Sequence, residues 1–434
     1  MGIFSKVAGV GLAVMMGLAP AIGDGLTEEE QKIMDAVDAA FDDQLSFLTE
    51  TINISSGTRN LEGVRKVGVV MDKAYSELGF QTRWIDMPEE MNRAGHLAGK
   101  LDLGDGPKIM LIGHLDTVFP KDSPFQTATR RGERIYGPGA SDMKGGNAVL
   151  LYALKALKAS GNLDQGTLQV ILTGDEESTG KPLSVSRKDM IDMAKESDIA
   201  LNFEGGALST AVIGRRGSSG WALEVTGRRA HSSAIFSDQV GAGAIFEASR
   251  IIHKFYEEVR KIPGLTFNPG VIAGGTKVEE GENQSYQSAF GKSNVVASKV
   301  VVNGGLRFLS EEDKEKARDI MRKIVAENLP HTSATVTFTD SYPAMTATPA
   351  NEELLAIFSQ VNQDLGLGEV TAFPPERRGA ADISFVAPYV PASMDGLGAF
   401  GGSSHTEDEW TDIEGLRLTT KRTALYLHRL LSAQ

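Results

Sequence analysis

Residues 111–146 constrain the fold more than any other stretch of the chain. An apolar run at residues 109–113 ends at His114, and Asp116 follows two positions later. Residues two apart on a strand face the same side, so this imidazole and this carboxylate can meet. A Gly-rich turn carrying Asp142 then opens a helical pattern. An apolar strand, a polar loop and a helix in this order are typical of an α/β protein with a site at its strand ends.

More metal-ligand residue types follow other predicted strands. Glu176 and Glu177 come after the β-like run 167–172, Glu204 closes the run 199–203, and His405 lies in the loop GAFGGSSHTEDEW. A carboxylate at the end of an apolar strand is costly unless it is paired or bound to metal. A buried, satisfied core pair is the commoner fate of one His and one Asp, but here such residues recur. The sequence therefore predicts a metal site.

The number of candidate ligands indicates two metal ions. Two divalent ions sharing a carboxylate would neutralise the acids and activate a water molecule. The adjacent side chains of Glu176 and Glu177 should point in different directions, so that one binds metal while the other accepts a proton. This arrangement is typical of a hydrolase.

Chain length and net charge limit the number of domains and the kinds of partner that can be expected. A chain of 434 residues exceeds the usual size of one core, so two domains are expected. A formal charge of -13 argues against nucleic acid as a partner, because phosphate binding requires a basic face. The chain contains no Cys, which says little about its compartment.

Residues 1–23 have the form of a secretory signal peptide. Lys6 precedes an apolar run at residues 7–18, and Ala19-Pro20-Ala21 provides small residues for cleavage. The run is too short to span a bilayer, although an uncleaved N-terminal anchor is the alternative. We expect a periplasmic or secreted protein with no membrane association after cleavage.

The order of predicted elements divides the remainder into three segments. A capping box at Thr27 and Glu30 starts a helix whose apolar stripe continues to Leu48. Strands and helices then alternate through residues 24–213, the first part of a catalytic domain. Residues 214–341 read βαββαβ, with a polar loop at 277–292, which predicts a ferredoxin-like insertion. Residues 342–434 complete the catalytic domain.

Five motifs give the chain a family resemblance. HLDTV, GASDMKGG, GDEES, NFEGG and GGSSHTEDEW resemble, in order and spacing, the M20 metallopeptidases, and within them the carboxypeptidase G2-like glutamate carboxypeptidases. The resemblance covers essentially the whole chain after the signal. It implies a zinc-peptidase-like α/β catalytic domain, a mixed sheet flanked by helices, with an inserted ferredoxin-like lid and dimerisation domain.

The resemblance also implies roles for individual residues. His114 and Glu204 would hold one zinc ion, Glu177 and His405 the other, and Asp142 would bridge them, with a cis peptide bond after it. Asp116 would orient His114, and Glu176 would be the general base. Cobalt or manganese could replace zinc, since carboxylate-rich sites accept several divalent ions.

In the insertion, the resemblance implies residues that complete the site. His231 would enter the site of a second subunit and stabilise the oxyanion, and Asn294 and Arg307 would hold the substrate. The alternative for His231 and Arg307 is a solvated surface charge. The protein is therefore expected to be a homodimer joined through the insertion.

The chain departs from the family pattern at three places. Ala297 replaces a Pro, and Gly379-Ala380-Ala381-Asp382 replaces a Gly-Gly-Thr-Asp segment. Tyr342 stands where glutamate-specific members carry an Arg. A preference for C-terminal glutamate is thus open, with substitutes for the missing cation at Arg215, Arg216, Arg377 or Arg378.

These observations predict an exported di-metal exopeptidase. It would hydrolyse the amide bond to a C-terminal amino acid, with a small peptide as substrate. One alternative is an aminoacylase or deacylase acting on N-acyl amino acids. A second alternative is an inactive relative that binds peptides.

Overall fold

The computed structural model describes residues 25–281 and 287–433 of the chain. The predicted signal peptide, residues 1–23, lies outside the described residues, as does its cleavage site. No helix in the described part combines the length and the hydropathy needed to cross a bilayer.

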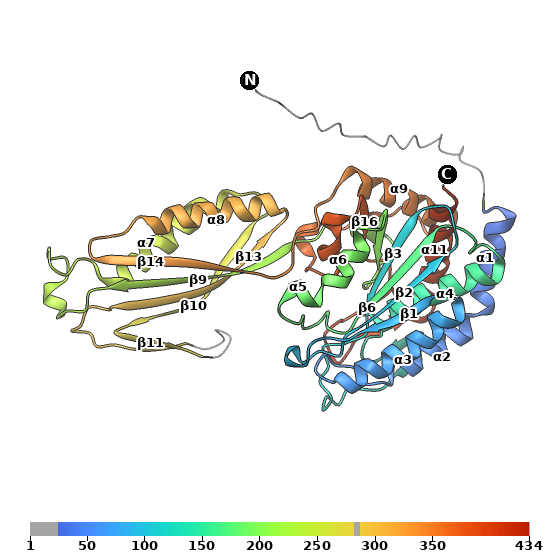
Figure 1. Ribbon diagram of the computed structural model, residues 1–434, viewed down its shortest axis with the longest axis horizontal. Coiled ribbons are helices and arrows are strands. Elements are labelled where there is room, and N and C mark those ends of the chain that lie inside the picture. Colours follow the sequence, from blue (N-terminus) through green and yellow to red (C-terminus); the bar gives the residue numbers. More distant parts are fainter. Residues whose placement is uncertain (1–24, 282–286, 434) are drawn as a thin grey trace, which may run out of the picture.

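A six-stranded mixed sheet forms the centre of the larger part of the molecule (Figure 1). Its strand order is β1-β2-β6-β3-β7-β16. β6, β3, β7 and β16 run parallel, whereas β1 and β2 are antiparallel to their neighbours. The strands are β1 Gln81–Ile85, β2 His96–Asp102, β3 Lys108–His114, β6 Thr167–Thr173, β7 Ile199–Asn202 and β16 Ala392–Met394.

Helices cover both faces of this sheet. Along β3, Ile109 and Leu111 join a core that includes α1 to α4 and α11, whereas Met110 and Ile112 join the core beside α6 and α10. This alternation follows from the two-residue period of a strand, and it explains the continuous apolar run before His114. The helices are α1 Glu28–Ala39, α2 Phe41–Ile52, α3 Leu61–Leu78, α4 Lys144–Ser160, α5 Leu183–Ser186, α6 Lys188–Ala194, α9 Pro349–Asp364, α10 Ile383–Val386 and α11 Ile413–Ser432.

The expected N-terminal helix is two helices. Thr27 and Glu30 form the predicted capping box at the start of α1. The chain leaves helical geometry at Ala40, which has ψ near 1°, and α2 begins at the next residue. The apolar stripe continues across the break, since Ile33, Phe41 and Leu48 are all buried.

The second sheet has the ferredoxin-like arrangement. Its elements are β9 Gly217–Gly227, α7 Gly243–Glu258, β10 Thr266–Gly275, β13 Lys299–Phe308, α8 Glu311–Ala326 and β14 Thr332–Asp340. The order β10-β13-β9-β14, with every pair antiparallel, is that of a split βαβ fold. It lies to one side of the mixed sheet in Figure 1. These elements fall within residues 214–341, and the boundaries themselves stay a prediction.

Part of the expected polar loop at 277–292 is a β-hairpin. β11 Lys277–Glu280 pairs with β12 Gln287–Phe290 in an antiparallel register. Both strands are largely solvent-exposed, so they lack the apolar alternation that signals a half-buried strand. Short strands elsewhere are β4 Thr129–Arg131, β5 Arg134–Tyr136, β8 Thr210–Ala211, β15 Thr371–Ala372, β17 Gly401–Gly402 and β18 Trp410–Asp412.

Candidate metal centre

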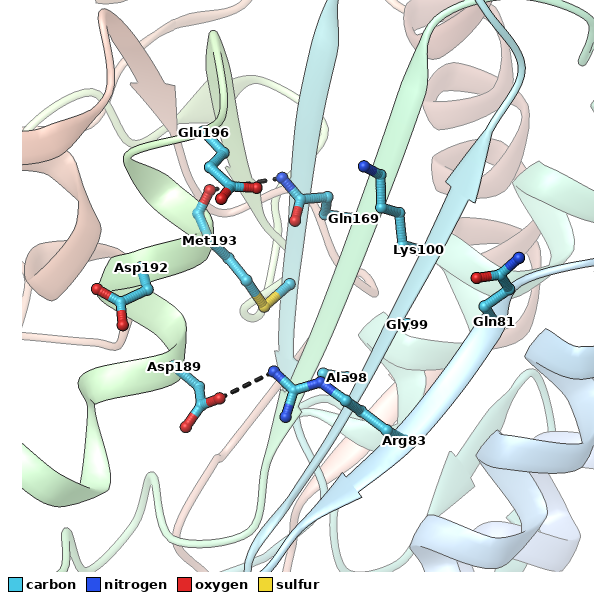
Figure 2. Close-up of a pocket in the computed structure, with 10 residues that line it drawn as sticks. All are labelled: Gln81, Arg83, Ala98, Gly99, Lys100, Gln169, Asp189, Asp192, Met193 and Glu196. Atoms are coloured by element: carbon cyan, nitrogen blue, oxygen red, sulfur yellow. Dashed lines mark hydrogen bonds and ion pairs between the residues drawn. The ribbon is translucent and has the colours of Figure 1, made fainter.

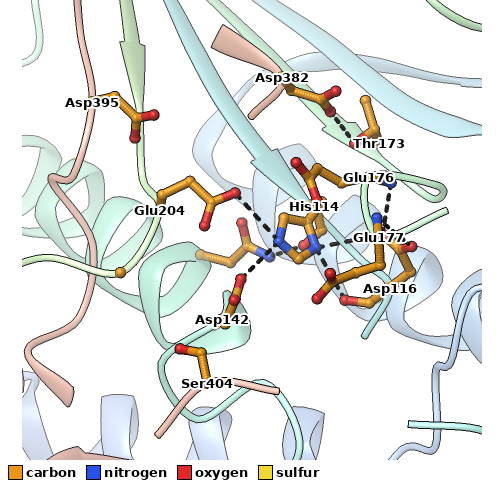
Figure 3. A network of polar contacts seen from close by, with 12 residues as sticks. His114, Asp116, Asp142, Thr173, Glu176, Glu177, Glu204, Asp382, Asp395 and Ser404 are labelled. Carbon is orange, nitrogen blue, oxygen red and sulfur yellow. Dashed lines mark hydrogen bonds and ion pairs between the residues drawn. The ribbon is translucent and has the colours of Figure 1, made fainter. Parts of the chain in front are cut away.

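The predicted ligands gather at the carboxyl ends of neighbouring parallel strands. His114 is the last residue of β3, Glu177 follows β6, and Glu204 lies two residues beyond β7. Asp142 precedes α4, and His405 comes from the loop between β17 and β18. Ligands commonly bind at this edge of an α/β sheet. Figure 3 shows most of these side chains converging beside His114.

Asp142 belongs to two separate groups of candidate ligands. His114, Asp142 and Glu204 form one group, and Asp142, Glu177 and His405 form the other, each with ligand atoms within 4.8 Å of one another. Asp142 Oδ1 lies 3.2 Å from His114 Nε2, and its Oδ2 lies 3.2 Å from His405 Nε2. One carboxylate thus presents a different oxygen to each group. The Asp142–Met143 peptide bond is cis, as the resemblance implied.

Asp116 has more contacts than the sequence suggested. The nearest partner of His114 Nδ1 is the Asp116 backbone carbonyl at 3.0 Å, with the carboxylate at 3.4 Å. That carboxylate accepts hydrogen bonds from the backbone N–H groups of Glu176 and Glu177 and from the hydroxyl of Thr58. Asp116 therefore fixes both the His114 ring and the loop that carries the two glutamates.

The adjacent glutamates diverge, as predicted. Glu177 Oε2 lies 3.2 Å from His405 Nε2. The Glu176 carboxylate forms no hydrogen bond within the described part of the chain, and Figure 3 shows its side chain leaving the loop in another direction. Its backbone carbonyl accepts a hydrogen bond from the hydroxyl of Tyr342 at 2.9 Å.

The charges of the site are poorly balanced without cations. Burial and the nearby Asp142 raise the pKa of Glu204 to about 8, and burial also raises the pKa of Glu177. Hydrogen bonds to Asp142 and Glu177 raise the pKa of His405 to about 11. Burial alone would lower the pKa of His114, but its carboxylate partners raise it well above the ordinary value. Divalent cations among these groups would favour the ionised carboxylates and the neutral imidazoles.

The residues present fit two divalent metal ions. Glu177 Oε1 is buried and has no hydrogen-bond partner in the described structure. Each group offers one imidazole nitrogen and two carboxylate oxygens, which are ligand types that zinc accepts. The sharing of Asp142 matches a site for a pair of ions.

Sequence reasoning missed the residue that holds Asp142. The buried carboxylate of Glu409 accepts hydrogen bonds from the backbone N–H groups of Ser141 and Asp142, both at 2.9 Å, and of Gly139 at 3.3 Å. Glu409 lies in the GGSSHTEDEW motif, so the signal was present, but nothing local distinguishes it from its acidic neighbours. It fixes the backbone from which the shared ligand projects.

A buried ion-pair network holds the start of the loop that carries Glu176. Arg187 is fully buried and binds Asp175 at 2.6 Å and Asp382 at 2.9 Å. Asp175 directly precedes Glu176 and also accepts a hydrogen bond from the N–H of Gly180. No local sequence pattern signals this network, because its residues come from distant segments.

The predicted residues of the insertion are not brought to the metal ligands within one chain. His231 follows β9 and is exposed, with its Nδ1 2.8 Å from Ser233 Oγ. Asn294 and Arg307 are also exposed. Their predicted roles therefore require another subunit or a movement of the insertion.

A hollow on the mixed sheet contains none of the predicted site residues. It has a volume of about 250 Å³ and lies between β1, β2, β6 and α6 (Figure 2). Its charges are largely matched, since Arg83 pairs with Asp189 at 2.8 Å across it. It offers no clustered metal ligands and stands apart from the metal centre.

Comparisons with known proteins identify the family. The model of peptidase family M20/M25/M40 matches residues 110–429. Carboxypeptidase G2 from Pseudomonas sp. (strain RS-16) is 27% identical over 422 residues, which cover 93% of this chain and 94% of that protein. Succinyl-diaminopimelate desuccinylase from Methylococcus capsulatus is 26% identical over 363 residues, covering 78% and 86%.

A solved structure has the same fold. The M20 family metallo-carboxypeptidase Sso-CP2 from Sulfolobus solfataricus superposes with a TM-score of 0.64 at 17% identity, covering 89% of this chain and 98% of that one. The predicted fold class and family resemblance are confirmed. From the family match and the two groups of ligands, we conclude that the chain belongs to peptidase family M20/M25/M40 and is a metal-dependent hydrolase.

Proposed function

We propose that the protein is an exported exopeptidase that uses two divalent metal ions, zinc first among them, to hydrolyse the amide bond to a C-terminal amino acid. The observation that carries this proposal is the sharing of Asp142 between two groups of ligands. The second support is a further acid, Glu176, which belongs to neither group. The 27% identity to a carboxypeptidase adds to the argument.

The chain supplies a general base for this reaction. When bound, the two ions would lower the pKa of a water molecule and polarise the amide carbonyl. Glu176 would accept the proton of the attacking water and pass it to the leaving nitrogen. Burial and the neighbouring Glu204 raise the pKa of Glu176 well above the ordinary value. A carboxylate with a raised pKa is a stronger base when it is ionised, and bound cations would favour the ionised form.

Fixed hydrogen bonds hold Glu176 in place for this role. Asp116 accepts from its backbone N–H at 3.1 Å, and Tyr342 donates to its backbone carbonyl. Both backbone polar groups of Glu176 are therefore hydrogen-bonded. Such preorganisation reduces the cost of aligning the base with the water.

We propose that a homodimer completes the site. β9 begins beside the metal-binding part, where Ser218 bonds to the backbone of Tyr342. Its eleven residues span roughly 35 Å, and His231 lies beyond their far end. A second subunit could bring His231 to a site that its own subunit cannot complete. There the imidazole would donate a hydrogen bond to the oxyanion, while Asn294 and Arg307 would hold the substrate.

Exposed apolar side chains on the insertion support this association. Phe236 and Phe246 pack with tilted rings whose centroids are 5.5 Å apart, although they are 67% and 52% exposed. Ile245 and Ile272 are 49% and 59% exposed. Several large apolar side chains open to solvent in one region are typical of an interaction surface.

A deacylase acting on N-acyl amino acids is the second candidate. The similarity to a desuccinylase favours it, and the metal ligands would be the same. Both reactions cleave an amide bond next to a free carboxylate. Only the shape and charge of the substrate pocket would separate the two activities.

A substrate panel tests the proposal. Dipeptides and N-acyl amino acids with C-terminal Glu, Asp, Ala, Leu and Phe would be incubated with the metal-loaded enzyme, with and without chelator. We expect chelator-sensitive release of the C-terminal amino acid. Faster turnover of N-acyl amino acids than of dipeptides would favour the deacylase. Turnover that chelator does not affect would contradict both.

Export is tested separately. The protein would be expressed with its N-terminus intact in a Gram-negative host, and the periplasmic form would be sequenced from its N-terminus. We expect the mature chain to start near residue 22. An uncleaved protein in the membrane fraction would contradict the signal peptide.

A further inference from the structure

A cavity adjoins the metal centre on the side of Glu204 and His405. It has a volume of about 220 Å³. Ser141, Gly205 and Ser404 line it, and each is the sequence neighbour of a predicted metal ligand. The cavity is therefore placed to receive the part of a substrate next to the bond that is cleaved.

Arg378 is the only charged residue that lines this cavity in the described part of the chain. Its Nη2 donates a hydrogen bond to the carbonyl oxygen of Gly205 at 2.7 Å. Its guanidinium carbon lies 5.4 Å from the ring centroid of Phe373, and Nη2 lies close to Gly396. The guanidinium is thus held at the cavity wall by the carbonyl of Gly205, the residue that follows Glu204 in the sequence.

This guanidinium has unused hydrogen-bonding capacity. Its Nε is buried and has no partner in the described structure. Burial lowers the pKa of Arg378, and the charge of Arg215 lowers it further. The unpaired Nε could therefore donate a hydrogen bond to an added acceptor. A carboxylate suits the planar fork of an Arg.

The other arginines near the pocket are poorer candidates. Arg215 is buried and already paired with Asp395 at 2.6 Å, and it also donates to the carbonyl of Gly379. Arg377 stacks on the same Phe373 ring at 5.5 Å but is exposed and does not line the cavity. Arg216 does not line it either. Tyr342 carries no cation, and its hydroxyl bonds to Thr179 and to the Glu176 carbonyl.

We propose that Arg378 binds a carboxylate of the substrate's C-terminal amino acid in this cavity. This inference rests on the proposed exopeptidase or deacylase function. It assigns a substrate-binding role to a loop in which the chain departs from the family pattern. The carboxylate is either the α-carboxylate or that of an acidic side chain.

The hydrolysis of three N-acyl amino acids distinguishes the α-carboxylate from a side-chain carboxylate as the group that Arg378 binds. Benzoyl-Glu, benzoyl-Gln and benzoyl-Leu would be hydrolysed by the wild type, Arg378→Met and Arg377→Met, all metal-loaded. We expect Arg378→Met to reduce kcat/KM by about 10- to 100-fold, the range for losing hydrogen bonds to a charged group. A loss confined to benzoyl-Glu identifies the side-chain carboxylate. An equal loss on all three identifies the α-carboxylate. Arg377→Met is the matched control and should stay within about 2-fold of the wild type.

A binding measurement keeps the inference independent of turnover. Glutarate, a dicarboxylate without a scissile bond, would be titrated calorimetrically into the same three proteins. We expect its Kd to rise at least about 10-fold in Arg378→Met only, with partial recovery in Arg378→Lys, which keeps the charge but not the fork. Metal content and thermal unfolding of Arg378→Met verify that the variant folds, and Arg378→Lys replaces it if it does not.

The outcomes separate the two proposals. If the wild type hydrolyses nothing in the panel but its glutarate binding depends on Arg378, the proposed function fails and the carboxylate site stands. If the wild type is active and Arg378→Met matches Arg377→Met in turnover and in glutarate binding, the role of Arg378 is overturned.

Discussion

The mixed-sheet part and the ferredoxin-like insertion differ in how deeply their charged and candidate functional residues are buried. Around the mixed sheet, charged groups are buried against one another, as in the contacts of Arg187 with Asp175 and Asp382. In the insertion, His231 and Arg307 are exposed, and so are large apolar residues such as Phe236. The first region holds its ligands within one chain. The second exposes such charged and apolar groups to solvent, and the proposed subunit interface would cover them.

This difference predicts that substitutions in the two regions fail in different ways. A change near the mixed sheet should impair metal binding, chemistry or stability in each chain separately. A change in the insertion should be rescued by a second, intact chain. The following experiments test this distinction, beginning with the largest expected effect.

Glu176→Gln should abolish most of the activity. Removing a general base costs typically about 10²- to 10⁴-fold in kcat. Glu176 lies in neither ligand group, so the metal content should equal that of the wild type. Steady-state kinetics and elemental analysis measure the two quantities. Loss of metal together with activity would show that Glu176 is a ligand instead.

Arg187→Met should strongly reduce stability. The substitution leaves two buried carboxylates, Asp175 and Asp382, without their cation, and breaking a buried pair costs about 3–5 kcal/mol. Arg83→Met is the matched control, because its partnership with Asp189 is largely exposed and worth about 0–1 kcal/mol. Urea unfolding of both variants gives the comparison. Equal losses in the free energy of unfolding would contradict the account.

His231→Ala should lower kcat by about 10²- to 10³-fold, as expected for removing an oxyanion donor. The decisive measurement mixes it with Glu176→Gln after unfolding and refolding together. If His231 acts in the partner's site, half of the dimers are hybrids with one intact site, and activity should recover to about a quarter of the wild type. If it acts within its own chain, no hybrid site is intact and no activity returns.

Metal uptake should release protons near neutral pH. The pKa of His405 is raised to about 11 and that of Glu204 to about 8 in the metal-free site, so both hold protons that metal must displace. The raised pKa of His405 stabilises the metal-free fold below about pH 6.5, and this contribution is lost as the pH rises towards 11.

The raised pKa of Glu204 acts in the same direction. Its proton is present up to about pH 8 in the fold but is lost near pH 4.5 in the unfolded chain, so stability falls between these values. Calorimetry in buffers of different ionisation enthalpy measures the proton release. Thermal unfolding with chelator against pH measures the stability. Metal affinity that is independent of pH would contradict this prediction.

Local sequence placed candidate ligands at the ends of predicted strands, whereas their division between two ions came from the family resemblance. His114, Glu177 and Glu204 each follow an apolar strand, so residue type and periodicity point to the same place. Glu409 could not be found in this way, because its contact with the Asp142 backbone joins residues 267 positions apart. The Arg187 network likewise depends on how distant segments pack. The break at Ala40 has no Gly or Pro to signal it, and the β11–β12 hairpin lacks an apolar face.

Titration of the metal-free protein with zinc tests the central claim most directly. Hydrolysis and bound metal would be followed together in the wild type and in Asp142→Ala. We predict that wild-type activity reaches its plateau only when two equivalents of zinc per chain are bound. Loss of the shared Asp142 carboxylate should weaken the binding of both ions. Full wild-type activity at one equivalent, or an Asp142→Ala protein that binds two ions as tightly as the wild type, would contradict the shared metal centre.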